Sequence, residues 1–377
     1  MKKVIFALAA VVALAACSQE DVIVADKGAA IGFDTFVENS TRSVNDPSWS
    51  NTKLFADFGV YGYVENAVLF DNVEVTGSGL NGEWSYADNL TQYWITGAKY
   101  NFAAIAPKAN AHEDVVFSVA LNGDEYVGTT VLPFTNVDGT NDLLYAQNAQ
   151  YVAGVSGQNG KVGFNFRHLL SKVKFSFENA YNASNATIRV KNVNITNTWK
   201  SATATLGVNS TSWGSHNDTL NLYFGDATDN EATTDKESTV AAKQFKFEDT
   251  YESLNERLMI PGTAPLVTYS KKDAEGTPTE VTENVYVVTF TVELLVNDTV
   301  VKTYPHTAYA KFTPVAGNFY DIKTQINETN IDPNNEQEPI QFTVTNITDW
   351  DEDHDGKENT AAGDTDGDNQ VDTEFEI

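Results

Sequence analysis

Apolar and polar residues alternate in short runs along most of the chain, and turn-forming residues separate these runs. Nine runs are expected to form strands: 31–37, 58–64, 100–106, 115–121, 172–177, 186–195, 286–296, 309–312 and 341–347. No stretch keeps a helical period over three turns, and the nearest to one, 247–257, is short and polar. The pattern therefore predicts an all-β fold made of antiparallel β-sandwiches.

The length and a change of register indicate how the sandwiches divide the chain. At about 100–200 residues per domain, 377 residues correspond to two domains. Phe164 and Phe166 lie on one face of a run, whereas the apolar positions after His168 become Val173 and Phe175. Such a change marks a break or a bulge. We expect an N-terminal β-sandwich over 43–165 and a C-terminal β-sandwich over 166–350.

The first residues have the pattern of an export signal. Lys2 and Lys3 precede an uncharged apolar run over 4–16, which is too short to span a bilayer core of about 30 Å. The run ends in Leu-Ala-Ala-Cys at Cys17, the only cysteine of the chain, and this ending resembles the lipobox of bacterial lipoproteins. We therefore predict a lipoprotein signal peptide at 1–16, lipidation of Cys17 and a membrane anchor. The alternative is an ordinary signal peptide with an incidental cysteine.

The segment 18–21, Ser-Gln-Glu-Asp, follows that cysteine. It resembles the export tag that carries lipoproteins of some Gram-negative anaerobes to the outer face of the outer membrane. A solvated linker is the alternative interpretation. The lipobox and the tag together predict a lipid-anchored precursor at the cell surface.

The net charge of the chain excludes a nucleic-acid partner, and its acidic residues are concentrated at the C-terminal end. The sequence holds 24 Lys+Arg against 52 Asp+Glu, for a formal net charge of −28. A nucleic-acid partner is excluded because phosphate binding needs clustered cations. Residues 349–377 hold twelve carboxylates and one cation. We interpret 351–377 as an acidic spacer that ends in a strand.

Part of this spacer resembles a calcium loop. Asp364, Asp366 and Asp368 match oxygen ligands at positions 1, 3 and 5, but position 12 is Phe375, where a bidentate carboxylate belongs. A complete EF-hand is therefore not encoded. Two alternatives remain, a weak calcium site or a solvated spacer that carries no cofactor.

The last residues alternate strictly. Apolar or β-branched side chains share one face and three carboxylates line the other, the first set being Val371, Thr373, Phe375 and Ile377. This pattern predicts an amphipathic strand beyond a flexible spacer. The strand either folds back as an edge strand of its own domain or is donated to a neighbouring subunit.

Motifs for catalysis are missing from the sequence. The five histidines never fall at the spacing of a zinc motif, no G-x-S-x-G elbow occurs, and lipidation would consume the lone cysteine. Residues 77–82 fit G-x-G-x-x-G, but strand or turn residues follow where a dinucleotide fold needs a helix. We predict that the protein is not an enzyme and has no catalytic residue.

Several motifs in a fixed order resemble those of the fimbrillin family, the subunits of type V pili and related surface lipoproteins. They are the lipobox, 30–36, 40–42, 92–94 with 100–107, 141–146 and the block 162–173, which contains Phe-Arg-His-Leu-Leu-Ser-Lys-Val. The resemblance extends nearly to Trp350. It implies two transthyretin-like sandwich domains and a precursor that is cut after an arginine beyond its first strand. A strand from another fimbrillin-type subunit then fills the vacated site, which builds an adhesive fimbrium.

Arg42 is the arginine that fits this processing. The chain has four arginines, and Arg42 is the one that lies among Asn, Ser, Thr, Asp and Pro, whereas Arg167, Arg189 and Arg257 lie in runs expected to be structured. The segment 17–42 would then be removed. The alternative is that Arg42 is a simple surface cation.

A second function stays open from the sequence alone. The protein is then a surface lipoprotein that never polymerises and that binds glycan or host protein, with tryptophans such as Trp49, Trp84 and Trp213 as sugar platforms. Tryptophans more often belong to a core.

Overall fold

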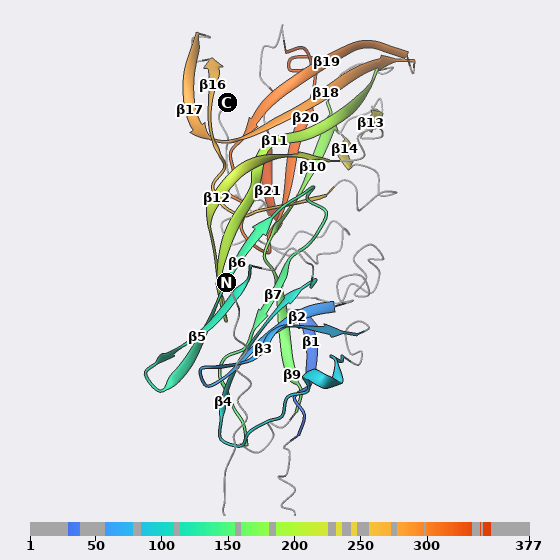
Figure 1. The fold of residues 1–377 in the computed structure, drawn as a ribbon. Helices are drawn as coiled ribbons and strands as arrows, with labels where there is room; N and C mark the ends of the chain where they lie inside the picture. Colours follow the sequence, from blue (N-terminus) through green and yellow to red (C-terminus); the bar gives the residue numbers. More distant parts are fainter. Residues whose placement is uncertain are drawn as a thin grey trace, which may run out of the picture.

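The computed structural model describes residues 29–37, 57–77, 84–108, 114–154, 160–180, 186–224, 231–235, 243–246, 256–272, 277–297, 299–333, 340 and 342–347. The only helix among them is the 3₁₀ helix η1 (Asp88–Leu90), and the other regular elements are strands. The prediction of an all-β fold is confirmed. Figure 1 shows an elongated molecule with β1–β4 and β9 at one end and β16–β20 at the other.

The first sheet lies at the β1 end of the molecule and has seven strands. Its order is β1 (Phe33–Val37), β9 (Val162–His168), β7 (Leu144–Gln147), β4 (Lys99–Ala106), β2 (Asp57–Val64) and β3 (Ala67–Thr76), with β8 (Tyr151–Val152) also paired to β4. Among the described strands, β1 lies at the edge of this sheet and pairs with β9 alone. This β1–β9 pair is parallel, whereas the other described strand pairs of this sheet are antiparallel.

The other sheets build the rest of the molecule. The second contains β14 (Lys243–Lys246), β10 (Ser171–Asn179), β20 (Phe319–Ile326), β21 (Thr343–Ile347) and β15 (Arg257–Met259). The third contains β19 (Thr299–Ala310), β18 (Tyr286–Val296), β11 (Ala186–Gly207), β6 (Glu125–Thr135), β5 (Val116–Asn122), β12 (Ser210–Tyr223) and β13 (Glu231–Asp235). A hairpin of β16 (Leu266–Lys272) and β17 (Pro278–Asn284) is the fourth. The pair β10–β20 is parallel, so the sheets are not purely antiparallel as predicted.

Each of the nine predicted runs overlaps a strand of the structure. The bounds differ most at β11, which continues from 195 to Gly207. Residues 247–255 of the weak helical candidate lie outside the described residues, and Arg257 begins β15. Thr76 and Ser85 exchange two backbone hydrogen bonds of 2.9 Å, and most of the G-x-G-x-x-G string between them, residues 78–83, lies outside the described residues.

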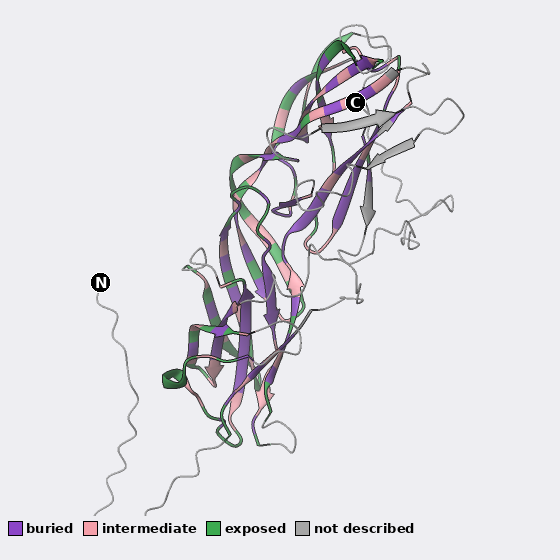
Figure 2. Cartoon of the chain, turned by 90° about the vertical axis from the view of Figure 1, so that its right-hand side faces the viewer, coloured by how far each residue is buried: buried purple, intermediate pink, exposed green. Residues whose placement is uncertain are grey.

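Three clusters of buried residues form the core, coloured purple in Figure 2. One takes its members from residues 31–166 and another from residues 173–344. The third joins the first sheet, for example Ile105 and Tyr145, to the third sheet, for example Leu132 and Ala204. Both faces of the first sheet are therefore buried, which explains why β4 (Lys99–Ala106) has seven consecutive buried residues.

The third sheet runs along the molecule and connects its two ends. One half of β11 pairs with β18, and the other half pairs with β6, which precedes residue 165 in the sequence. At about 3.3 Å per residue, its 22 residues extend over about 70 Å. The strand β11 is thus shared by the packing of both ends.

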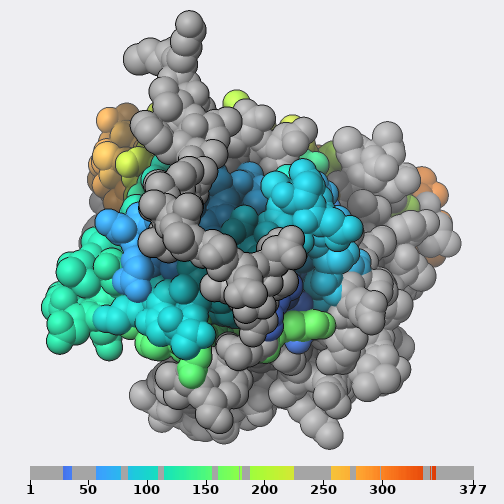
Figure 3. Space-filling model, turned by 60° about the horizontal axis from the view of Figure 1, so that its bottom comes forward, coloured from blue at the N-terminus to red at the C-terminus, as the bar shows by residue number. Residues whose placement is uncertain are grey.

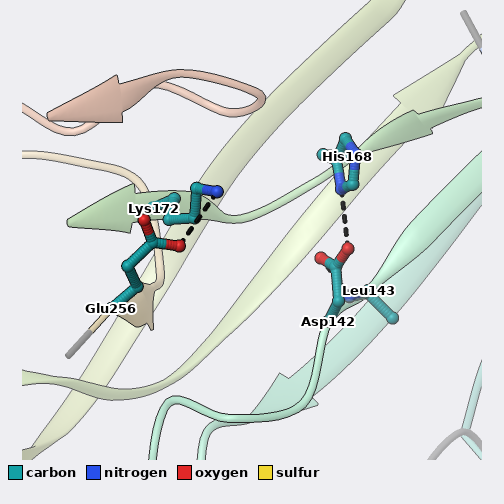
Figure 4. A network of polar contacts seen from close by, with 5 residues as sticks. All are labelled: Asp142, Leu143, His168, Lys172 and Glu256. Carbon is teal, nitrogen blue, oxygen red and sulfur yellow. Dashed lines mark hydrogen bonds and ion pairs between the residues drawn. The ribbon is translucent and has the colours of Figure 1, made fainter. Parts of the chain in front are cut away.

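Polar contacts of the segment 167–172 reinforce the junction between the ends (Figure 4). The Nδ1 atom of His168 lies 2.6 Å from the Oδ2 atom of Asp142, whose side chain is 3% exposed. Lys172 Nζ lies 3.0 Å from Glu256 Oε2, also with both side chains nearly buried. The guanidinium of Arg167 donates to the carbonyls of residues 207, 208 and 210, in the turn between β11 and β12.

Candidate functional site

The strand β1 is the feature that the fold sets apart. The place that it occupies in the first sheet is called the β1 site. Residues 33–37 pair with β9 in the register Phe33↔Val162, Thr35↔Phe164 and Val37↔Phe166. Because the other backbone edge of β1 has no strand partner in the described structure, β1 is held on one side only along this stretch.

The short segment before β1, residues 29–31, is hydrogen-bonded to residues of the 86–94 region. Ile31 N donates to Gln92 O at 2.9 Å, and Trp94 N donates to Ala29 O at 3.0 Å. The Tyr86 hydroxyl donates to Ile31 O at 2.7 Å. A tyrosine hydroxyl is protonated at neutral pH, and burial raises the pKa of Tyr86 further. Figure 3, seen from this end, shows the cyan residues of the 84–98 region beside the blue residues of the N-terminal segment.

The side chains of β1 fill an aromatic pocket. Phe33 is 1% exposed, and its ring centroid lies 5.5–6.3 Å from four other rings, those of Phe70, Tyr86, Phe102 and Phe164. Burying the Ile31 and Phe33 side chains contributes about 1.5–3 kcal/mol each to the docking of the strand. Removal of β1 would take from these rings their contacts with Phe33 and leave one edge of β9 without its described strand partner.

The remaining contacts of β1 are weaker. Thr35 is buried, and its Oγ1 atom has no hydrogen-bond partner among the described atoms. Asp34 Oδ1 lies 2.9 Å from Lys161 Nζ, but both side chains are more than 40% exposed. Such an exposed pair contributes at most about 1 kcal/mol. Apolar burial, rather than ion pairing, therefore holds β1 in place.

The site residues predicted from the sequence lie outside the described residues, so their positions are not part of the described structure. They are Cys17, Arg42, Asp364, Asp366, Asp368, Val371, Thr373, Phe375 and Ile377. Their roles stay predictions. Among the described residues, no group of three His, Cys, Asp or Glu side chains is placed to hold a metal ion. The described part likewise holds no helix with the length and apolar composition that crossing a membrane requires.

The other three arginines are held in strands, as expected. Arg167 lies in β9, bonded to the β11–β12 turn. Arg189 Nη1 lies 3.3 Å from Glu293 Oε2 across the β11–β18 pair. Arg257 is 6% exposed at the start of β15. A protease needs an extended, accessible segment, so none of these three is a ready substrate.

The interpretation of Trp84 as a sugar platform is wrong. Trp84 is 7% exposed and its ring packs on Phe58 with centroids 5.0 Å apart. Trp213 is half-buried, packs edge-on against Phe134 and donates its Nε1–H to Leu169 O at 3.0 Å. Trp49 lies outside the described residues.

Sequence reasoning missed the lining of the β1 site. The alternation of Ile31, Phe33 and Thr35 with other residues predicts the strand itself. The lining comes from residues 70–164, and a chain pattern does not show which strand meets which across such distances.

Comparison with known proteins supplies the family. The model of the fimbrillin-like family matches residues 41–350. A search of curated proteins finds no match.

Three solved structures illustrate the similarity. A candidate cell adhesion protein of Bacteroides uniformis is 15% identical, covers 84% of this chain and 96% of its own, and has a TM-score of 0.41. One of Bacteroides ovatus is 14% identical, with 85% and 97% covered and a TM-score of 0.44. The fimbrial anchor protein Mfa2 of Porphyromonas gingivalis is 12% identical, with 78% and 90% covered and a TM-score of 0.27. Because the family model spans most of the sequence, the chain belongs to the fimbrillin-like family.

Proposed function

We propose that this chain is a structural, non-catalytic subunit of an adhesive cell-surface fimbria. It is exported as a lipoprotein precursor anchored through Cys17, and cleavage after Arg42 removes its first strand. A strand from a neighbouring subunit then enters the β1 site. Family membership supports a fimbrial or adhesin-type role, and the remaining steps are our proposal.

The observation that carries the proposal is the position of β1. Among the described strands it lies at the sheet edge with one strand partner, and the buried ring of Phe33 lies against aromatic rings of the first sheet. An edge strand can leave without breaking a sheet in two. The site left behind has both requirements for strand addition, a free backbone edge and pockets for alternate side chains.

The position of Arg42 supports cleavage there. The strand β1 ends at Val37 and β2 begins at Asp57, so a cut after Arg42 breaks the covalent connection between β1 and the strands that follow it. The other three arginines lie in paired strands. The positions of these three arginines and the polar sequence around Arg42 support the proposal that cleavage occurs after Arg42.

The alternating segment 371–377 is the proposed donor strand, and 351–370 is its spacer. A calcium site at Asp364, Asp366 and Asp368 stays a prediction and is not needed for strand exchange.

Two variants test the proposal in cells. Arg42→Ala should leave the precursor uncut and stop assembly, whereas Lys27→Ala, a cation in the same segment, should be processed normally. Deletion of 373–377 should leave a folded monomer that forms no polymer, whereas deletion of 358–362, of equal length, should not affect assembly. Polymer is scored as ladders that resist mild heating in detergent. Ladders from the 373–377 deletion would refute strand donation, and normal maturation of Arg42→Ala would refute processing there.

A further inference from the structure

The strand β5 (Val116–Asn122) lies at an edge of the third sheet. Among the described strands it pairs with β6 alone, in an unbroken register that closes through the turn at Gly123 and Asp124. Alternate residues of an antiparallel strand direct their N–H and C=O groups to opposite sides, so about half of the β5 groups point away from β6. Figure 1 shows this hairpin at the margin of the molecule. The outer side of β5, here called the β5 edge, is therefore placed to accept another strand.

The β5 edge lacks the features that normally protect sheet edges from pairing. Charged side chains, proline and bulges are the usual protection. The edge strand β3 carries Asp71 and Glu74 and has register shifts, and β19 carries Lys302 and Pro305 and has one register shift. The edge strand β12 carries Asp218 and has register shifts as well. The strand β5 has none of these features, and it is the longest described edge strand of which this is true.

Apolar side chains lie next to the β5 edge on both faces of the sheet. Val116 is 56% exposed on one face, and Leu121 is 62% exposed on the other. On the face of Val116, the β6 residues Val127 and Val131 are 43% and 38% exposed. Aliphatic and β-branched side chains of an added strand would cover these residues and gain cross-strand contacts. The side chains therefore favour a partner strand that is apolar or β-branched on both faces.

The charges around β5 define the ends of such a partner. Residues 115–123 contain no charged side chain. Acids bracket this run on both sides, Glu113 and Asp114 before it and Asp124 and Glu125 after it. Asp114, Asp124 and Glu125 are exposed. Lys99 Nζ donates to the backbone carbonyl of Asp124, so the turn keeps a net negative charge. The electrostatic complement of this edge is an uncharged strand with a cation at each end.

Charge also disfavours a second copy of this chain at the β5 edge. Antiparallel pairing of two β5 strands about Val119 would place Asp114 of each copy opposite Asp124 of the other. Parallel pairing in register would place each acid beside its own counterpart. Like charges directly opposite each other destabilise a strand pair, and each copy carries a formal net charge of −28. The occupant that the charges favour is therefore a different, cationic polypeptide.

We propose that the β5 edge binds an extended segment of another protein, with an uncharged, β-branched or aliphatic centre and a Lys or Arg at each end. Backbone hydrogen bonds to β5 hold the segment, and its end cations lie opposite Asp114 and Asp124. This binding goes beyond the proposed function, since neither cleavage after Arg42 nor exchange of β1 uses β5. Its failure would therefore leave the proposed function standing.

Two synthetic peptides test the charge requirement. The probe is Lys-Thr-Val-Thr-Val-Thr-Val-Thr-Val-Thr-Lys, blocked at both termini and equal in length to 114–124, and the control has Glu in place of both lysines. Binding to the full chain with Cys17→Ala is measured by fluorescence anisotropy. We expect the Lys-ended peptide to bind at least about tenfold more tightly at about 0.1 M salt, and this ratio to shrink at about 1 M, where charges are screened beyond about 3 Å. Equal affinities, or no binding of the Lys-ended peptide, would overturn the proposal.

A charge reversal locates the site on the protein. In the double variant Asp114→Lys with Asp124→Lys, the preference should change to the Glu-ended peptide. The matched control is Asp71→Lys with Asp88→Lys, which makes the same change of net charge at exposed positions outside β5. This control should keep the preference of the wild type. An unchanged preference in the first variant, or a reversed one in the control, would overturn the assignment to the β5 edge.

Backbone methylation tests strand pairing itself. A strand bonds its neighbour through alternate residues, so N-methylation of every valine and N-methylation of every threonine block opposite edges of the peptide. One methylated peptide should lose at least about tenfold in affinity while the other keeps most of it, and equal losses would overturn pairing through the backbone. A wild-type dimer in sedimentation that the Lys-ended peptide dissociates would assign the edge to a second copy and overturn the proposal as well.

Discussion

Phe33→Ala should loosen β1 without unfolding the rest of the protein. The Phe33 ring is 1% exposed and touches four other rings, so its truncation removes buried contacts and leaves a cavity. Phe→Ala changes in cores cost about 3–5 kcal/mol. Since β1 is an edge strand with one strand partner, most of this loss falls on the docking of β1 rather than on the whole fold.

The magnitude follows from that cost. At about 1.4 kcal/mol per factor of ten, the population with β1 detached should rise about 10²–10⁴-fold. Hydrogen exchange measured by mass spectrometry should show faster exchange at residues 33–37 and at the facing residues of β9. Cleavage of the full chain by an arginine-specific protease, followed by release of the N-terminal peptide, should be faster to match.

Phe175→Ala is the matched control for this change. Phe175 is also 1% exposed, but it lies in β10, where its ring is 4.7 Å from that of Phe224. This variant should lose about 3–5 kcal/mol of global stability, because Phe175 lies in the core, while the exchange of β1 relative to that of the core stays unchanged. Equal exchange of residues 33–37 in Phe33→Ala and wild type would refute the conclusion that this ring holds β1 in its site.

Three further predictions concern stability. Arg167→Met should lower the free energy of unfolding by about 2–4 kcal/mol, because the carbonyls of the β11–β12 turn lose charged donors; Arg167→Lys should restore only part of it, as measured by urea unfolding. Asp142→Ala should cost about 1–3 kcal/mol by removing the buried carboxylate that is hydrogen-bonded to His168 and Leu143 N, against at most about 1 kcal/mol for Asp34→Ala at an exposed pair. Burial lowers the pKa of His306, so as the pH falls the unfolded state takes up a proton at this residue before the folded state does. The stability contributed by the neutral histidine is therefore complete above pH about 6.5 and is lost as the pH falls below it. His306→Gln should remove this part of the dependence of the unfolding free energy on pH. Equal losses of unfolding free energy in Arg167→Met and Arg167→Lys would contradict the first prediction, and equal losses in the two aspartate variants would contradict the second. The third fails if the unfolding free energies of wild type and His306→Gln depend on pH in the same way.

Strands with one wet face could be predicted from the sequence, and others could not. The residues of β18 alternate between buried and half-buried along almost its whole length, so their polarity alternates too. The strand β4 is buried on both faces, so its seven buried residues lack the alternation that the sequence pattern predicts for 100–106. The strand β12 is mostly exposed and polar, and its pairing with β11, rather than its own composition, makes it a strand.

Pairing between distant segments was beyond the sequence. The alternation of residues 31–37 predicts a strand, but nothing in it shows that this strand runs parallel to residues 162–166. The same holds for β11, which extends past the predicted end at residue 195 because β6 and β12 supply partners there. Register and direction depend on both strands of a pair, and the residue pattern within one strand does not identify its partner.

The central claim is that the protein loses its first strand and is then joined to other subunits by strand exchange. The N-terminus of chains recovered from assembled surface fibres tests this most directly, by mass spectrometry of the isolated polymer. The account predicts that the polymerised chains begin at Ser43. Polymerised chains that begin at lipid-modified Cys17, with β1 retained, would contradict it.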